Sequence, residues 1–292
     1  MMSQFYKNSF VMFALISILS YGILAFNIEN QGISIDEVFH HGFGMTYFDL
    51  VVEGKILDPC ITGIGDCNLI DLASDPYHWT SSGGIVKGLL LGIGDHFFSE
   101  NDDRIYYGPY HENVRPLHHN EAVSGVNIPT QSELAAARFF SPILGSLTIA
   151  ISFFIGKLLF SRFVGASFAV VLLFHGLWMH HSRILTSEVY VNFFIILSVF
   201  LLLYGNNKDK KTMMKFLILG AITFALAVNT KMTSLELLPF LIMIIVFIQQ
   251  PFNENINFRK LWNKRFFLKS IALVSIFIGI FFGALFSTFP FY

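Results

Sequence analysis

Residues 137–203 read ARFFSPILGSLTIAISFFIGKLLFSRFVGASFAVVLLFHGLWMHHSRILTSEVYVNFFIILSVFLLL and contain three apolar runs in close succession. The runs cover about residues 137–160, 163–181 and 185–204, and only short polar breaks separate them. A helix needs about 20 apolar residues to cross the hydrocarbon core of a bilayer, and each run is close to that length. The stretch therefore predicts three consecutive transmembrane helices joined by tight turns.

The rest of the chain has the same apolar character. Of the 292 residues, 54% are hydrophobic, 16% are aromatic and only 13% are charged, which excludes an ordinary soluble domain. Further apolar runs lie at about residues 9–27, 213–229, 233–250 and 268–288. No small-x-small cleavage pattern closes the first run, so we interpret it as an uncleaved anchor and not as a secretory signal. The sequence predicts an all-α polytopic membrane protein with about seven transmembrane helices.

Basic residues are crowded into the short loops of one membrane side. With the amino terminus in the cytoplasm, the basic residues inside are Lys7, Lys157, Arg162, Lys208, Lys210, Lys211, Lys215, Arg259, Lys260, Lys264, Arg265 and Lys269. All acidic residues except Asp209 and Glu254 then lie outside. The positive-inside rule describes this distribution, so we expect a cytoplasmic amino terminus in a cell membrane or an ER-type membrane. No basic domain or aromatic-basic interleaving indicates a nucleic-acid partner.

This topology leaves one large extracytoplasmic loop, about residues 28–136, within a single module that covers residues 1–292. In the loop, residues 36–54 and 84–98 carry apolar side chains at helical spacing. They predict amphipathic helices that lie on the membrane surface or pack on the bundle. The two cysteines also fall in this loop, and they lack the further ligand pair of a zinc site, so a disulfide and two free thiols both stay open. They are Cys60 and Cys67.

Ionisable residues beside the predicted spans gather at the outer membrane face. Arg138 opens the second span, Arg183 precedes the fourth, Glu188 stands one turn inside it, and Lys231 lies in the turn NTKMTS. Such residues are costly near a membrane and are candidates for function, although the cations could also be interfacial anchors. Their position suits chemistry on a lipid headgroup, whereas a transporter would more often need polar groups at the midplane. His175, inside the third span, is interpreted as a hydrogen-bonded packing residue.

The stretch GISIDEVFHHG follows the first span closely. Ser34 and Glu37 form a capping-box pattern that predicts the start of a helix. Asp36 with His40, and Glu37 with His41, are spaced i, i+4, so a metal site is an alternative whose metal is unknown. Transfer of a sugar from a polyprenyl phosphate would need a carboxylate to take the acceptor proton and cations to hold the departing phosphate. The outer face offers both kinds of group.

In this order, the motifs resemble those of the GT-C membrane glycosyltransferases. The resemblance is in particular to the protein O-mannosyltransferases of glycosyltransferase family 39 and to their bacterial lipid A aminoarabinose transferase relatives. IDEVFHHGFGMTYF is similar to the acidic motif after the family's first span, which implies Asp36 as catalytic base with Glu37 in support. YHWTSSGGIVKGLLLGIGDHFF resembles the family's His-Pro-Pro-Leu-x-Lys segment and implies roles for His78 and Lys87, although both prolines are missing.

Two further motifs carry the resemblance. The Arg-x4-acid pattern at the end of residues 137–203 maps to Arg183 and Glu188, and LAVNTKMTSLELLPFLI resembles the family's lysine-containing turn near the donor phosphate, which maps to Lys231. The resemblance implies donor-phosphate contacts by Lys231, Arg183, Lys87 and Arg138, and sugar, acceptor or metal contacts by Glu188, His40 and His78. A divalent cation, Mg²⁺ or Mn²⁺, stays open, because family 39 enzymes are not generally thought to need an ion whereas oligosaccharyltransferase relatives do.

The implied activity is inverting transfer of a mannose-like hexose from a polyprenyl- or dolichyl-phosphate donor. The acceptor would be an extracytoplasmic hydroxyl of a protein, lipid or glycan. The alternative is a non-catalytic membrane subunit that binds a second membrane chain or lipid through its outer loop. Family members usually continue with more spans, so the resemblance covers the seven-span module and leaves an acceptor-binding half absent or supplied by another chain.

Overall fold

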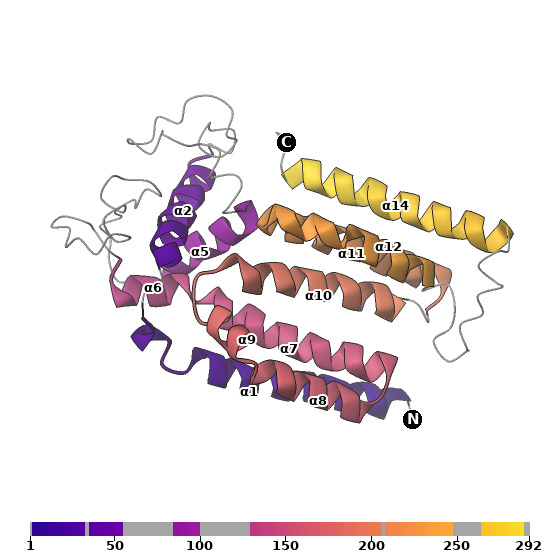
Figure 1. The fold of residues 1–292 in the computed structure, drawn as a ribbon, viewed down its shortest axis with the longest axis horizontal. Coiled ribbons are helices and arrows are strands. Elements are labelled where there is room, and N and C mark those ends of the chain that lie inside the picture. The colour runs from indigo at the N-terminus through magenta and orange to yellow at the C-terminus, as the bar shows by residue number, and fades with distance from the viewer. Residues whose placement is uncertain are drawn as a thin grey trace.

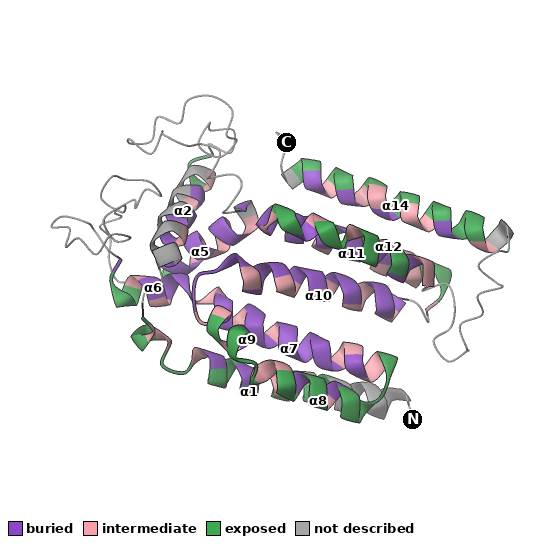
Figure 2. Ribbon diagram, in the orientation of Figure 1, coloured by how far each residue is buried: buried purple, intermediate pink, exposed green. Residues whose placement is uncertain are grey.

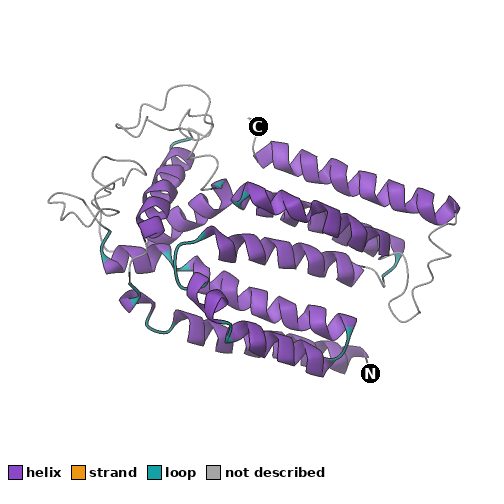
Figure 3. Cartoon of the chain, viewed as in Figure 1, coloured by secondary structure: helices purple, strands orange, loops and turns teal. Residues whose placement is uncertain are grey.

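The computed structural model of the chain describes residues 2–32, 35–54, 84–99, 129–205, 208–247 and 264–288. Within these ranges every regular element is a helix, and no strand occurs (Figures 1 and 3). The helices are α1 (Met2–Ala25), η1 (Ile28–Asn30), α2 (Ile35–Val52), α5 (Ile85–Phe98), α6 (Gln131–Ala137), α7 (Phe140–Leu159), α8 (Arg162–Leu173), α9 (Gly176–His181), α10 (Ser187–Gly205), α11 (Lys210–Thr230), η3 (Met232–Leu237), α12 (Leu238–Phe247) and α14 (Lys264–Thr288).

The long helices lie side by side in one bundle, while α2, α5 and α6 gather at one end of it (Figure 1). In the described residues, five helical segments are long and apolar enough to cross a membrane. They are Phe10–Asn30, Gln131–Leu159, Ser187–Gly205, Lys210–Thr230 and Phe266–Ser287. Each overlaps one of the predicted spans, so the prediction of an all-α polytopic membrane protein is confirmed.

The two other predicted spans are shorter helices. The helix expected over residues 163–181 is broken: α8 has 12 residues, about 18 Å of rise, and α9 follows after a turn. The break lies at His175, whose ring Nδ1 accepts a hydrogen bond from the Trp178 amide at 3.4 Å and so begins α9. The interpretation of His175 as a packing residue within one span was wrong, because its side chain is an exposed helix cap.

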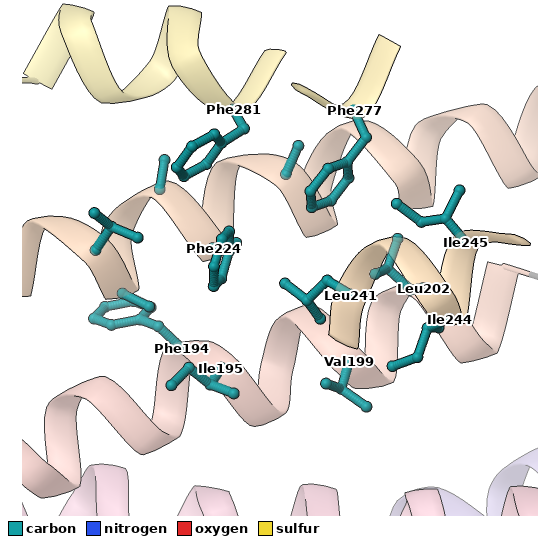
Figure 4. Close-up of a cluster of buried hydrophobic side chains, with 14 of the residues drawn as sticks. Phe194, Ile195, Val199, Leu202, Phe224, Leu241, Ile244, Ile245, Phe277 and Phe281 are labelled. Atoms are coloured by element: carbon teal, nitrogen blue, oxygen red, sulfur yellow. The ribbon is translucent and has the colours of Figure 1, made fainter. Parts of the chain in front are cut away.

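One hydrophobic core joins α10, α11, α12 and α14. The ring of Phe224 lies 5.2 Å from that of Phe281 and 6.5 Å from that of Phe277, measured between centroids (Figure 4). In a bilayer, lipid tails are as apolar as these side chains, so the core is stabilised by close packing and not by escape from water.

Small polar side chains connect neighbouring helices. Ser198 Oγ of α10 donates to the Gly220 carbonyl of α11 at 2.8 Å, and Ser141 Oγ of α7 lies 3.1 Å from the Tyr190 hydroxyl of α10. Interhelical hydrogen bonds of this kind contribute about 0.6 kcal/mol each on average in membrane proteins. Two of the helices that they connect, α10 and α11, also carry residues of the candidate site.

Large apolar side chains cover the outside of the bundle. Phe163, Phe168 and Phe174 of the α8 segment are exposed, as are many side chains of α1 and α14 (Figure 2). A soluble monomer rarely exposes apolar surface on this scale, whereas a bilayer would cover it. Together with the five long apolar helices, this surface shows an integral membrane protein.

The two ends of the bundle differ in charge. The α7–α8 turn, the α10–α11 turn and the start of α14 lie at the end opposite α2, α5 and α6 (Figure 1). Basic residues mark these connections, for example Lys157, Arg162 and Lys208. Those ionisable residues predicted to be functional that the structure describes, such as Lys87, Glu188 and Lys231, are found at the other end.

Candidate functional site

Helices α2 and α5 cross at very short range because glycines meet at their contact. A Cβ added to Gly44 of α2 would lie 2.6 Å from the Cβ of Leu91, and one added to Gly92 of α5 would lie 2.3 Å from the Cβ of Phe48. Side chains other than hydrogen would separate the helices at either position. The close crossing places Lys87, one turn before the contact, beside the first half of α2.

A fully buried ion pair fixes the start of α2. Arg138 Nε and Nη2 donate to Glu37 Oε1 and Oε2, each at 2.7 Å, and both side chains are 0% exposed. Arg138 also donates to three backbone carbonyls between residues 28 and 32, at 3.0 to 3.4 Å. Glu37 Oε1 accepts a further hydrogen bond from the Leu185 amide at 2.8 Å. The pair thus joins α2, the end of α6 and the segment before α10.

Lys87 lies buried between α2 and α10. Its Nζ donates to Ser187 Oγ at 2.9 Å and lies 2.7 Å from His40 Nδ1. The side chain of Lys87 is 0% exposed. A lysine from α5 is therefore held by one residue of α2 and by the first residue of α10.

Lys231 lies next to the same turn of α10. Its Nζ donates to Glu188 Oε1 at 2.7 Å, and the two side chains are 38% and 37% exposed. Lys231 ends α11, and its carbonyl accepts hydrogen bonds from the amide and hydroxyl of Ser234 in η3. Ser187 and Glu188 are consecutive, so adjacent residues of α10 bind the two lysines.

Gly84 brings the two lysine-bearing elements together. It precedes α5 with φ 55°, and a Cβ there would lie 2.3 Å from the Thr230 carbonyl oxygen and 2.4 Å from that of Asn229. Only glycine allows the chain to approach the end of α11 so closely in this conformation. The contact places the start of α5 directly beside the residue before Lys231.

The electrostatics of the site keep His40 neutral. Burial, and then the positive charges of Lys87 and Lys231, hold the pKa of the His40 ring well below its ordinary value of about 6.5. A neutral imidazole has one nitrogen that accepts, and Nδ1 is the one beside Lys87. Both lysines lower the pKa of the same ring, which agrees with their position on either side of the first turn of α10.

The arrangement is suited to an anion. Two ammonium groups meet at the N-terminus of a 19-residue helix, whose first amides and dipole also favour negative charge. Among the described carboxylates close to this turn, Glu37 is neutralised by Arg138. Lys231 is half-exposed whereas Lys87 is buried, so the two lysines are open to the surroundings on the side of Lys231.

The remaining predicted residues are placed differently. Asp36 lies in the first turn of α2, one turn before His40, and its side chain lies outside the described residues, as do His78, Cys60 and Cys67 altogether. Arg183 donates to the Phe26 carbonyl and so connects α9 with α1 instead of joining the two lysines. Arg138 is occupied by Glu37 and backbone carbonyls, which favours a structural role over the predicted phosphate contact.

The acidic motif was also predicted to cap α2 through Ser34 and, as an alternative, to bind a metal ion. In the described residues no three metal-ligand side chains gather, but the Asp36 side chain that such a site would need is not among them, so a metal stays a prediction. Ser34, the expected capping partner, also lies outside the described residues. His41 Nε2 lies 3.0 Å from Asp95 Oδ1 of α5.

Sequence reasoning missed two residues of this region. Ser187 was hidden because a serine before an apolar run is an ordinary helix start, although TSE at residues 186–188 is the most polar part of that segment. Asp95 was a detectable signal, since it is a lone acid in the apolar stripe GLLLGIGDHFF. It pairs with His41 and stabilises the α2–α5 contact.

Comparison with known proteins identifies the family. Residues 118–290 match the model of the dolichyl-phosphate-mannose-protein mannosyltransferases, which covers α6 to α14 and includes Glu188 and Lys231. The comparisons with curated proteins and with solved structures gave no match. The matched segment is more than half of the chain and carries the helices that form one side of the lysine site. The chain therefore belongs to the dolichyl-phosphate-mannose-protein mannosyltransferase family and is a membrane glycosyltransferase of the mannosyltransferase type.

Proposed function

We propose that the chain transfers mannose from a dolichyl- or polyprenyl-phosphate donor to a hydroxyl of a protein acceptor, with inversion at the anomeric carbon. The observation that carries the proposal is the meeting of Lys87 and Lys231 at the N-terminus of α10 through Ser187 and Glu188. The donor phosphate gains negative charge as the sugar leaves it. Cations fixed in advance beside that phosphate stabilise the transition state more than the ground state.

Lys231 would bind the phosphate from the open side of the site. It is half-exposed, and its partner Glu188 can exchange it for the donor phosphate at small cost, because exposed ion pairs contribute only about 0–1 kcal/mol. Glu188, once released, would accept hydrogen bonds from hydroxyls of the sugar or the acceptor. Lys87 would support the phosphate from the buried side.

Asp36 is proposed as the general base that takes the proton from the acceptor hydroxyl. Its position in the first turn of α2 supports this role, because His40, one turn later, is already in contact with Lys87. The buried Glu37–Arg138 pair would hold this turn in place. In an inverting transfer the acceptor oxygen attacks the anomeric carbon from the side opposite the departing phosphate oxygen, so Asp36 would act across the sugar from the phosphate that the lysines hold.

The proposed orientation places this site on the extracytoplasmic side and the amino terminus in the cytoplasm. The basic connections at the far end of the bundle support it, because cytoplasmic loops carry an excess of lysine and arginine. The dolichyl chain would then lie in the outer leaflet with its phosphate at the level of Lys231.

Transfer of radiolabelled mannose from dolichyl-phosphate-mannose to a serine- and threonine-rich peptide tests the proposal. We expect Asp36→Asn to lower kcat about 10²- to 10⁴-fold, the usual contribution of a general base. Lys231→Met should raise the KM for the donor. Glu29→Gln, which changes an exposed carboxylate of η1 shortly before α2, is the control and should leave the rate unchanged.

Equal rates in wild type and Asp36→Asn would remove Asp36 as the base. Binding of dolichyl phosphate without transfer to any peptide would contradict the protein acceptor. Co-purification of a stoichiometric second chain, with activity only in its presence, would support the alternative in which this chain is a subunit.

A further inference from the structure

We propose that His40 is a positioning residue for the transfer: its neutral ring accepts a hydrogen bond from Lys87 and thereby fixes the Lys87 ammonium for the donor phosphate. The inference rests on the proposed function. It assigns His40 a role other than the sugar or metal contact predicted from the sequence. His40 acts through Lys87 and is not itself placed against the reacting atoms.

The direction of the hydrogen bond follows from the chemistry of the two groups. An ammonium carries three donors and no acceptor. Lys87 Nζ donates to Ser187 Oγ at 2.9 Å, and its 2.7 Å contact with His40 Nδ1 requires that nitrogen to accept. The ring proton of His40 must then be on Nε2, so a protonated ring could not make the same contact.

The position of Lys87 explains why it needs such partners. Lysine has a flexible four-carbon stem and only a point charge at its end, so it does not orient itself as arginine does. Here the ammonium is held from two sides, by His40 of α2 and by Ser187 of α10. Both of these acceptors are neutral, so neither of the two contacts cancels the charge of the ammonium.

The protonation state of His40 agrees with this role. Burial and the charges of Lys87 and Lys231 lower the pKa of the ring well below its ordinary value. His40 therefore remains an acceptor at neutral pH. The neighbouring His41 is the natural contrast, because its Nε2 contacts the carboxylate of Asp95.

The test compares His40→Asn with His40→Leu in the full-length protein in detergent. Asparagine and leucine have nearly the same shape, but only asparagine has an oxygen acceptor where histidine has Nδ1. The measurements are the Kd for radiolabelled dolichyl phosphate and the donor KM. We expect His40→Leu to raise both about tenfold, the factor that corresponds to 1.4 kcal/mol. His40→Asn should stay within about threefold of wild type, since it keeps the acceptor.

His41→Gln is the matched control on the same helix, since glutamine keeps a nitrogen close to the place of Nε2 beside Asp95. It should leave the Kd for dolichyl phosphate unchanged. Should His40→Leu not give folded protein, Ser187→Ala removes a second acceptor of Lys87 and should also weaken binding. Unchanged affinity in Ser187→Ala would overturn the proposal.

Three results would overturn the role of His40. The first is a Kd for dolichyl phosphate in His40→Leu equal to that of wild type. The second is an equal rise of this Kd in the asparagine and leucine variants together with a lower melting temperature, because a purely structural residue would give that result. The third is wild-type protein that fails to bind dolichyl phosphate, which would remove the proposed function as well. The first two leave mannose transfer by wild type intact, so the two failures are distinguishable.

Discussion

Replacement of Arg138 by methionine tests how the start of α2 is held. The change removes both hydrogen bonds to Glu37 and leaves that carboxylate buried and 0% exposed. It also removes the donors of three backbone carbonyls. Loss of one partner of a buried ion pair costs about 3–5 kcal/mol, because the other charge remains without compensation.

The expected effect is a fall in melting temperature on the order of 10 °C, since larger chains lose about 2–4 °C per kcal/mol. Intrinsic tryptophan fluorescence of the detergent-solubilised protein would report it. The double variant Glu37→Gln with Arg138→Met should lose less than the sum of the two single variants, because the second change removes a group that the first has left unpaired.

Arg183→Met is the control for this experiment, because Arg183 is only half-buried and its hydrogen bond goes to the Phe26 carbonyl. A melting temperature of Arg138→Met no lower than that of Arg183→Met would refute the reasoning. A wild-type melting temperature combined with weaker binding of dolichyl phosphate would instead restore Arg138 to the phosphate-binding group.

Three further predictions concern the site itself. Gly84→Ala should lower the melting temperature and raise the donor KM, because its Cβ would meet two backbone oxygens, whereas Gly279→Ala, with nothing within 4 Å of its Cβ, should be neutral or stabilising in thermal melts. His40 stays neutral when folded, so the unfolded chain binds the extra proton. The stability that His40 contributes should therefore fall as pH drops below about 6.5. Asparagine does not titrate, so the melting temperature of wild type should fall relative to that of His40→Asn over this pH range. Glu188→Gln should change the melting temperature by no more than about 4 °C, because the half-exposed pair with Lys231 contributes about 0–1 kcal/mol, but it should alter the Kd for dolichyl phosphate.

The broad fold was predictable because the bilayer imposes it. Apolar runs of about 20 residues can satisfy their backbone in lipid only as helices, and the five long segments follow those runs. The break at His175 was not predictable from hydropathy, because a histidine that caps a helix leaves the apolar average almost unchanged. Its effect is local hydrogen bonding, which a window of 20 residues does not register.

The candidate site was predictable in its residues but only partly in its contacts. Lys231, Glu188 and Lys87 were all named from motifs, and the structure brings them to one turn of α10. The pairing of Glu37 with Arg138 could not be inferred, because the two are 101 residues apart and helical spacing says nothing about distant partners. Glu37 had a sufficient local explanation as a capping residue, and that explanation hid the stronger one.

The contact of Gly84 with the end of α11 has a consequence for protein engineering. In the described residues this glycine is one of the places where the outer loop contacts the bundle, and added side-chain atoms there would collide with the main chain of Thr230. Chimaeras that exchange outer loops between homologous transferases should therefore keep Gly84 and α5 with their own bundle, together with α2, whose Gly44 and His40 contact α5. A junction inside α5 would combine Lys87 of one protein with α10 and Lys231 of another, so the two lysines would no longer be matched to the same helix.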